Sequence, residues 1–262
     1  MRFHERRDDL EKDRFAERWA SPRLRMAHIV EIGESAVGPY GISQLVSGRL
    51  LDDHDAVGMR GVLPALFASL DALRDADLSG THGYGLWHGD GNAPYTSWRD
   101  NLLLFDPPGE RGVQRERLAR SPIGATEFDA GFARIQELAA HCPEDRWLVH
   151  NDLLNNNVIV DADEVVFLDW GASIYGDFLY DWALLTFWWP WFARRWGGID
   201  MWAEVERHVA GSVPRFHERL RCYELDIGIG HIAFQAAHGR MDDARWTAAR
   251  TLALVKAPLA RR

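Results

Sequence analysis

The sequence predicts an α+β fold, in which a short strand-rich part precedes a larger, mainly helical part. Three observations support this prediction. Strand-like apolar runs occur within residues 28–46, further runs flank polar motifs within residues 147–168, and apolar residues recur at helical spacing through much of the remaining chain. We expect one domain over residues 1–46 and a second over residues 47–262.

The first predicted domain consists of a strand, a helix, a hairpin and a connecting segment. Leu10, Phe15 and Trp19 are spaced to lie on one face of the helix, and Pro22 follows its end. The runs on either side of a turn-rich connection are typical of paired strands. In chain order we expect the strand at 1–4, the helix at 8–20, and the hairpin strands at 28–32 and 40–46.

The second predicted domain begins with a helix whose apolar side chains face the core. Val62, Leu66 and Leu70 recur every four residues, which places them on one face of that helix. Similar periodic runs continue toward the C-terminus. In chain order we expect helices at 59–74, 128–141, 205–209, 220–234 and 244–255.

The most informative motif follows a short apolar run that starts at Trp147. His150, Asp152 and Asn157 form the pattern H-x-D-x-x-x-x-N. An isolated H-x-D usually marks a capped turn, so the weight of the motif depends on the residues that follow it.

A predicted hairpin directly follows this motif. Strands at 158–160 and 165–168 are joined by an acidic segment at 161–164, whose short side chains favour a tight turn. The hairpin returns the chain, so Asp169 is expected to lie beside Asn157.

This arrangement suits phosphoryl transfer, in which Mg²⁺ must be held by oxygen ligands next to a nucleoside triphosphate. Asp169 offers a carboxylate and Asn157 an amide oxygen. Asp152 could accept the proton of an attacking hydroxyl, and His150 is expected to brace the loop. Kinase catalytic loops divide these tasks in the same way, between an H-R-D-x-x-x-x-N loop and a D-F-G triplet.

The stretch resembles the aminoglycoside phosphotransferase family of kinase-like small-molecule phosphotransferases, and within it most of all the hygromycin B phosphotransferases. Further segments at 95–100, 187–191 and 219–246 support the resemblance. It implies a protein-kinase-like two-lobe fold, with a truncated N-terminal β lobe and a mainly helical C-terminal lobe. It also implies transfer of the γ-phosphate of ATP, with Mg²⁺, to a hydroxyl of an aminoglycoside-like compound, as in antibiotic resistance.

The resemblance assigns roles to residues of the first domain. Arg2 falls where these kinases carry the basic residue that pairs with phosphate, and Asp13 falls where they carry its acidic partner. An arginine at this place would contact phosphate oxygens through a planar fork. The segment Gln44, Leu45 and Val46 falls at the hinge between lobes, where backbone groups would meet the adenine.

Two acids after Asp169 are expected to have structural roles. Asp177 and Asp181 fall where family members keep carboxylates that accept backbone N–H groups of the catalytic loop.

The start of the chain supports an alternative interpretation. Family members carry two strands and a phosphate-covering loop before the position of Arg2, whereas this sequence begins at Met1. The alternative is a fragment or a non-catalytic pseudokinase. A third hypothesis is a metal-dependent hydrolase that uses His150, Asp152 and Asp169.

Acceptor binding is predicted at aromatic and acidic side chains of the second domain. Trp188 or Trp191 could stack on a sugar ring or attract a cation, although core packing explains most such residues. Glu224 and Asp226 could contact ammonium groups, although exposed helix charges are the simpler interpretation.

Composition restricts the class of protein. The formal net charge is −9, which argues against a nucleic-acid partner and is compatible with a cationic small acceptor. The two cysteines give no disulfide framework, and we expect neither a signal peptide nor a membrane span. These features predict a cytoplasmic protein, and we expect it to be a monomer.

Overall fold

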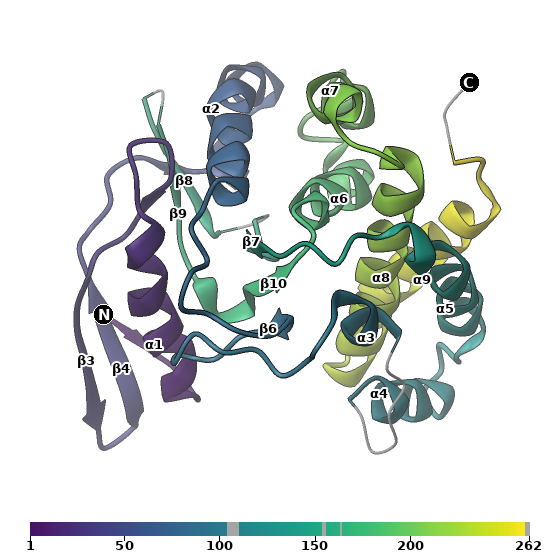
Figure 1. The fold of residues 1–262 in the computed structure, drawn as a ribbon, viewed down its shortest axis with the longest axis horizontal. Helices are drawn as coiled ribbons and strands as arrows, with labels where there is room; N and C mark the ends of the chain where they lie inside the picture. The colour runs from purple at the N-terminus through teal and green to yellow at the C-terminus, as the bar shows by residue number, and fades with distance from the viewer. Residues whose placement is uncertain (104–109, 154–155, 163, 260–262) are drawn as a thin grey trace. The chain divides into compact units, whose positions relative to one another are not determined.

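The computed structural model describes residues 1–262 except 104–109, 154–155, 163 and 260–262 (Figure 1). Its internal contacts group the chain into two compact units. Unit 1 comprises Met1–Thr96, Asp145–Asp181 and Trp191–Asp200, and unit 2 comprises Ser97–Glu144, Trp182–Pro190 and Met201–Arg262. The predicted domain boundary at residue 46 stays a prediction.

Among the described residues, unit 1 contains the named strands, the helices α1 and α2, and the start of α6. In chain order its elements are β1 (Arg2–Phe3), α1 (Arg7–Ala16), β2 (Arg25–Met26), β3 (Ile29–Ser35), β4 (Gly38–Ser43), β5 (Arg49–Leu50), α2 (Ala56–Arg74), β6 (Gly85–Leu86), β7 (Trp147–Val149), β8 (Val158–Asp161), β9 (Glu164–Phe167), the 3-10 turn η4 (Trp170–Ala172) and β10 (Ile174–Gly176).

The predicted order of strand, helix and hairpin at the start of the chain is present. An antiparallel sheet has the strand order β1-β4-β3, and α1 packs against β3, β4 and η4 (Figure 1). The hairpin strands are shifted by a few residues from their predicted bounds. Helix α1 ends at Ala16, and a 3-10 turn continues it to Trp19.

The second predicted hairpin lies at the centre of a sheet with the order β2-β9-β8-β5. Val158 pairs with Phe167, and the Leu168 amide donates to the Asn157 carbonyl at 2.9 Å, which extends the ladder by one step. Asp169 therefore follows directly beside Asn157, as predicted. Asp163, in the predicted turn, lies outside the described residues.

Helix α2 is the one described helix that is long and apolar enough to cross a bilayer by length and composition. Half of its apolar window is buried, and it packs against β7 and β9 within unit 1. A core helix of a water-soluble domain has these same properties.

Unit 2 is helical among its described residues. Its helices are α3 (Trp98–Leu103), α4 (Glu110–Ala119), α5 (Thr126–Leu138), α7 (Met201–Val209), α8 (Phe216–Ala237) and α9 (Met241–Lys256), while α6 (Leu179–Trp188) begins in unit 1 and continues here. Helix α8 packs against α4, α5 and α9, and is buried along much of its length (Figure 1).

Candidate active site

The catalytic-loop motif lies between β7 and β8, and His150 braces it from inside. The ring is fully buried, its Nε2 donates to the Leu168 carbonyl at 3.0 Å, and its Nδ1 accepts from the Asp152 amide at 3.3 Å. A carbonyl can only accept, so these partners define a neutral tautomer with the proton on Nε2. Burial lowers the pKa of His150 to about 4, which keeps it neutral and suits a bracing role.

Asp181 anchors the same loop from the start of α6. Its two carboxylate oxygens accept from the backbone amides of His150 and Asn151, both at 2.8 Å. Asn151 has a φ of 65°, in the left-handed region that most residues avoid. Burial raises the pKa of Asp181 to about 7, and the two amides oppose this shift. Asp177 is also buried and accepts from the Leu179 amide at 3.1 Å, at the start of the same helix.

Replacing Asp181 by alanine is expected to lower the free energy of unfolding by about 1–3 kcal/mol, because one buried and one partly buried backbone amide lose their acceptor. Urea denaturation measures this change. Asp145→Ala, at an exposed acid before β7, is the control and should unfold close to wild type. An Asp181→Ala midpoint equal to that of the control would contradict the anchoring role.

Asp152 and Asn157 are hydrogen-bonded to each other. The Asn157 Nδ2 donates to the Asp152 carboxylate at 2.7 Å and to the Asp152 backbone carbonyl at 3.0 Å. Because both acceptors are oxygens, the amide oxygen of Asn157 is turned away from them and can serve as a ligand. Burial raises the pKa of Asp152 to about 6, the charge of Asp169 adds to the shift, and Asn157 opposes it.

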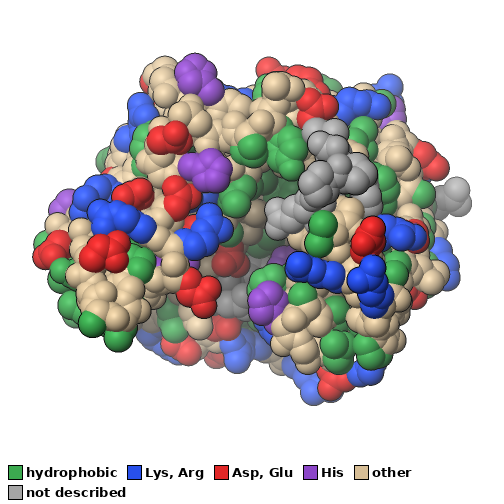
Figure 2. Space-filling model, turned by 90° about the horizontal axis from the view of Figure 1, so that it is seen from below, with side chains coloured by type: hydrophobic (Ala, Val, Ile, Leu, Met, Phe, Trp, Pro, Cys, Tyr) green, Lys and Arg blue, Asp and Glu red, His purple; other side chains and the backbone are tan. Residues whose placement is uncertain are grey.

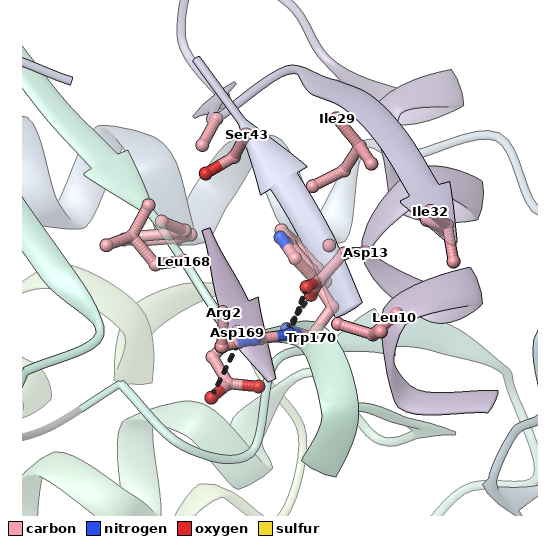
Figure 3. Close-up of a pocket in the computed structure, with 12 residues that line it drawn as sticks. Arg2, Leu10, Asp13, Ile29, Ile32, Ser43, Leu168, Asp169 and Trp170 are labelled. Carbon is pink, nitrogen blue, oxygen red and sulfur yellow. Dashed lines mark hydrogen bonds and ion pairs between the residues drawn. The ribbon is translucent and has the colours of Figure 1, made fainter. Parts of the chain in front are cut away.

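Asp169 sits in an unusual backbone conformation at the start of η4. Its φ is 61°, and its side chain keeps 38% of its surface exposed. Its carboxylate lies 3.0 Å from the Arg2 guanidinium, which also forms an ion pair with Asp13 (Figure 3). The second Asp13 oxygen accepts from the Trp170 amide at 2.8 Å. Arg2 and Asp13 thus pair as predicted, and both reach the segment that carries Asp169.

The donor set can accommodate one hard cation. The described residues contain no group of three or more His, Cys, Asp and Glu side chains suited to a metal ion. Mg²⁺ commonly takes only one or two protein ligands and completes its shell with water and phosphate oxygens. Asp169 and Asn157 match that requirement, and a cation there would offset the repulsion between Asp169 and Asp152 that helps to raise the pKa of Asp152.

A pocket of about 160 Å³ opens beside these charges (Figure 3). Its polar side consists of Arg2, Asp13 and Asp169. Its apolar walls come from α1, from the segment between β2 and β3, from β3, and from the end of β9; in that order they are Leu10, Ala27, Ile29 and Ile32, and Phe167 and Leu168. The apolar walls suit a flat apolar ring, and the Arg2 guanidinium at the charged end offers a contact for an anionic group.

The predicted hinge residues do not line this pocket. Ser43, the last residue of β4, lines it instead, while the Gln44 amide donates to the His28 carbonyl at 2.8 Å and Leu45 is 93% exposed. Adenine contacts by Gln44, Leu45 and Val46 stay a prediction. The sequence signal that could have identified Ser43 is its two-residue spacing from Gly41, which puts both on one face of β4.

The two predicted acceptor tryptophans belong to different units. In unit 2, Trp188 stacks on Trp246 with ring centroids 5.6 Å apart, and its edge meets His231. In unit 1, Trp191 exposes 41% of its surface.

The two predicted acceptor acids are buried in α8. Glu224 is 1% exposed, accepts from the Thr186 hydroxyl at 2.9 Å and pairs with Arg221 at 3.2 Å. Asp226 is 4% exposed. These placements favour structural roles for both acids, and their contact with an acceptor stays a prediction.

His231 provides a pH-dependent contribution to stability. Burial lowers its pKa to about 4, with Arg240 as a lesser cause. The unfolded chain therefore binds a proton between about pH 6.5 and pH 4 that the folded chain does not, so stability falls as the pH decreases through this range. His231→Phe should reduce this acid-induced loss of unfolding free energy by about 2 kcal/mol. This figure is smaller than the full lowering of the pKa implies, because His231 is partly exposed. Urea denaturation at several pH values tests this, and equal acid sensitivity of both proteins would contradict it.

Comparison with known proteins supports the kinase interpretation of this geometry. The model of the phosphotransferase enzyme family matches residues 94–204. Hygromycin-B 4-O-kinase from Escherichia coli is 30% identical over 259 residues, which cover 98% of this chain and 74% of that protein. RIO-type serine/threonine-protein kinase Rio1 from Methanocaldococcus jannaschii is 33% identical over 84 residues, 32% of this chain and 28% of that protein.

Solved structures agree with the sequence matches. A thermostable mutant of aminoglycoside phosphotransferase APH(4)-Ia, in ternary complex with AMP-PNP and hygromycin B, superposes with a TM-score of 0.83 at 31% identity, covering 95% of this chain and 83% of that one. The predicted fold class is thereby confirmed. The chain belongs to the aminoglycoside phosphotransferase family, a group of kinase-like enzymes.

Proposed function

We propose that this protein transfers the γ-phosphate of ATP to a hydroxyl group of an aminoglycoside similar to hygromycin B. The observation that carries the proposal is the meeting of Asp152, Asn157 and Asp169 beside the ion pair of Arg2 and Asp13. The hygromycin-B 4-O-kinase relative, and APH(4)-Ia with its bound ATP analogue and hygromycin B, support the choice of both substrates.

Each of these side chains has a task in the transfer. The acceptor oxygen forms a bond to the γ-phosphorus while the bond to the β–γ bridging oxygen breaks, and ADP leaves. Asp152 orients the acceptor hydroxyl and takes its proton, and Arg2 contacts phosphate oxygens. Asn157 and Asp169 would hold Mg²⁺, which when bound supplies positive charge to the phosphates. His150 and Asp181 keep the loop in place.

The presence of all these groups favours an enzyme over a non-catalytic module.

The surface charge bears on the partners. The acidic net charge of −9 suits a cationic acceptor. Acidic and basic side chains are interspersed over the visible face in Figure 2. We further infer a cytoplasmic monomer.

Nucleotide binding tests this proposal before any acceptor is chosen. Calorimetric titration with AMP-PNP should give clear binding with Mg²⁺ and much weaker binding without it, because Asp169 and Asn157 would hold the Mg²⁺ that offsets the phosphate charge. Absence of binding at millimolar nucleotide with Mg²⁺ would contradict the proposal. Binding with equal affinity in both conditions would contradict the metal roles of Asp169 and Asn157.

A further inference from the structure

Lys12 is a fully buried cation on α1 that the proposed reaction does not use. The sequence holds 30 lysine and arginine residues, and just two of them, Lys12 and Lys256, are lysines. A buried ammonium costs free energy unless its hydrogens find partners, so its contacts indicate why a charge is kept there.

The partners of Lys12 account for all three ammonium hydrogens. The Nζ donates to the backbone carbonyls of Gly171 at 2.7 Å and Ser173 at 3.0 Å, and it lies 4.6 Å from the centroid of the Trp87 ring. An ammonium can direct its three hydrogens to two carbonyls and one aromatic face at once. These contacts satisfy the buried charge of Lys12.

Both carbonyls belong to the segment that follows Asp169. Asp13, the next residue of α1, accepts from the Trp170 amide in the same segment. Helix α1 therefore binds residues 170–173 through both kinds of backbone group. Asp13 accepts from one N–H group, and Lys12 donates to two carbonyls. Asp169 has a φ of 61°, a conformation that persists only where the surroundings support it.

The charge of Lys12 is retained near neutral pH. Burial lowers its pKa to about 8, while Asp9, Asp8 and Asp13 favour the charged form and Arg6 opposes it. A protonated Lys12 is thus the main form at pH 7, and it donates all the hydrogens that the contacts require.

We propose that Lys12 is a positioning residue that, with Asp13, clamps residues 170–173 to α1 and so holds the Asp169 carboxylate in place for a metal. This inference rests on the proposed function, because it concerns the metal-holding role of Asp169. It assigns Lys12 no contact with nucleotide, metal or acceptor.

Lys12→Met, which keeps the length of the side chain and removes its donors, is expected to weaken the Mg²⁺-dependent part of ADP binding by about 10–100-fold, the usual effect of losing an outer-shell partner. ADP binding without Mg²⁺ should change little. Arg146→Met is the matched control, because Arg146 also donates to two carbonyls, of Thr81 and Gly83, and lies over the Tyr175 ring. The control should lose stability while its Mg²⁺ dependence stays that of wild type.

Calorimetry of both variants with and without Mg²⁺ separates positioning from simple stability. If Lys12→Met loses thermal stability but keeps the wild-type Mg²⁺ dependence, the positioning role is wrong. If both variants lose Mg²⁺ dependence equally, the effect is a general one and the proposal also fails.

If Lys12→Met does not fold, an NMR measurement on the chain with its native Lys12 tests the positioning role. With ¹⁵N-lysine labelling the protein gives two side-chain ammonium signals, and Lys256→Arg assigns them. The Lys12 signal should be protected from hydrogen exchange and should shift when ADP and Mg²⁺ are added together. A Lys12 signal that exchanges freely with solvent would contradict the clamp. So would a protected signal whose chemical shift stays unchanged when the protein binds ADP with Mg²⁺. If wild type binds no nucleotide, the proposed function fails, and the exchange measurement still reports on the clamp itself.

Discussion

Asp152→Asn is expected to lower kcat for phosphoryl transfer by about 10²–10⁴-fold, the usual contribution of a positioned acid–base group. The asparagine retains an oxygen that can accept from Asn157 Nδ2, so the loop should keep its shape. What it loses is the capacity to take the acceptor's proton. Steady-state kinetics measure kcat, and calorimetry should show nucleotide affinity within a few fold of wild type.

The control for this variant is Asp161→Asn, which changes the same residue type at the far end of the β8–β9 hairpin. Asp161 accepts from the Ser47 hydroxyl and pairs with Glu164 at the end of the hairpin away from Asn157, so the kcat of the Asp161→Asn variant should stay close to wild type. A kcat for Asp152→Asn within a few fold of this control would show that Asp152 is not the group that activates the acceptor.

Asp169→Asn is expected to raise the Mg²⁺ concentration needed for half-maximal activity by about 10–100-fold, because a neutral amide replaces the charged ligand. Asparagine tolerates the left-handed backbone that this position requires, so the change tests charge and not local folding. The ion pair with Arg2 is also lost, and Arg2 then keeps Asp13 as its partner.

Asp152→Asn and Asp169→Asn serve as controls for each other, because they are expected to change different quantities. Asp152→Asn should lose turnover with little change in its Mg²⁺ requirement, whereas Asp169→Asn should lose metal affinity first. Identical Mg²⁺ titrations of Asp169→Asn and wild type would remove Asp169 from the metal site.

The sequence could predict the site where local patterns determine it. The apolar runs on each side of the acidic turn predicted the hairpin, and the β8–β9 register then placed Asp169 beside Asn157. The pair of Arg2 and Asp13 came from the resemblance, and the structure brings these side chains together.

Features that depend on distant contacts could not be predicted. β2 has two residues and exists because it pairs in parallel with β9, so no local pattern marks it. The roles of Lys12 and Ser43 likewise depend on the segments that pack against them. Glu224 shows the converse, since an acid in a helical sequence looks exposed until its buried partner Arg221 is seen.

The most direct test is incubation of the protein with ATP, Mg²⁺ and hygromycin B, followed by mass spectrometry of the antibiotic. We predict a singly phosphorylated product that requires both ATP and Mg²⁺, is formed by the Asp161→Asn control, and is nearly absent with Asp152→Asn. Unmodified hygromycin B after full conversion of ATP to ADP, or equal product from Asp152→Asn and wild type, would contradict phosphoryl transfer to this acceptor by this site.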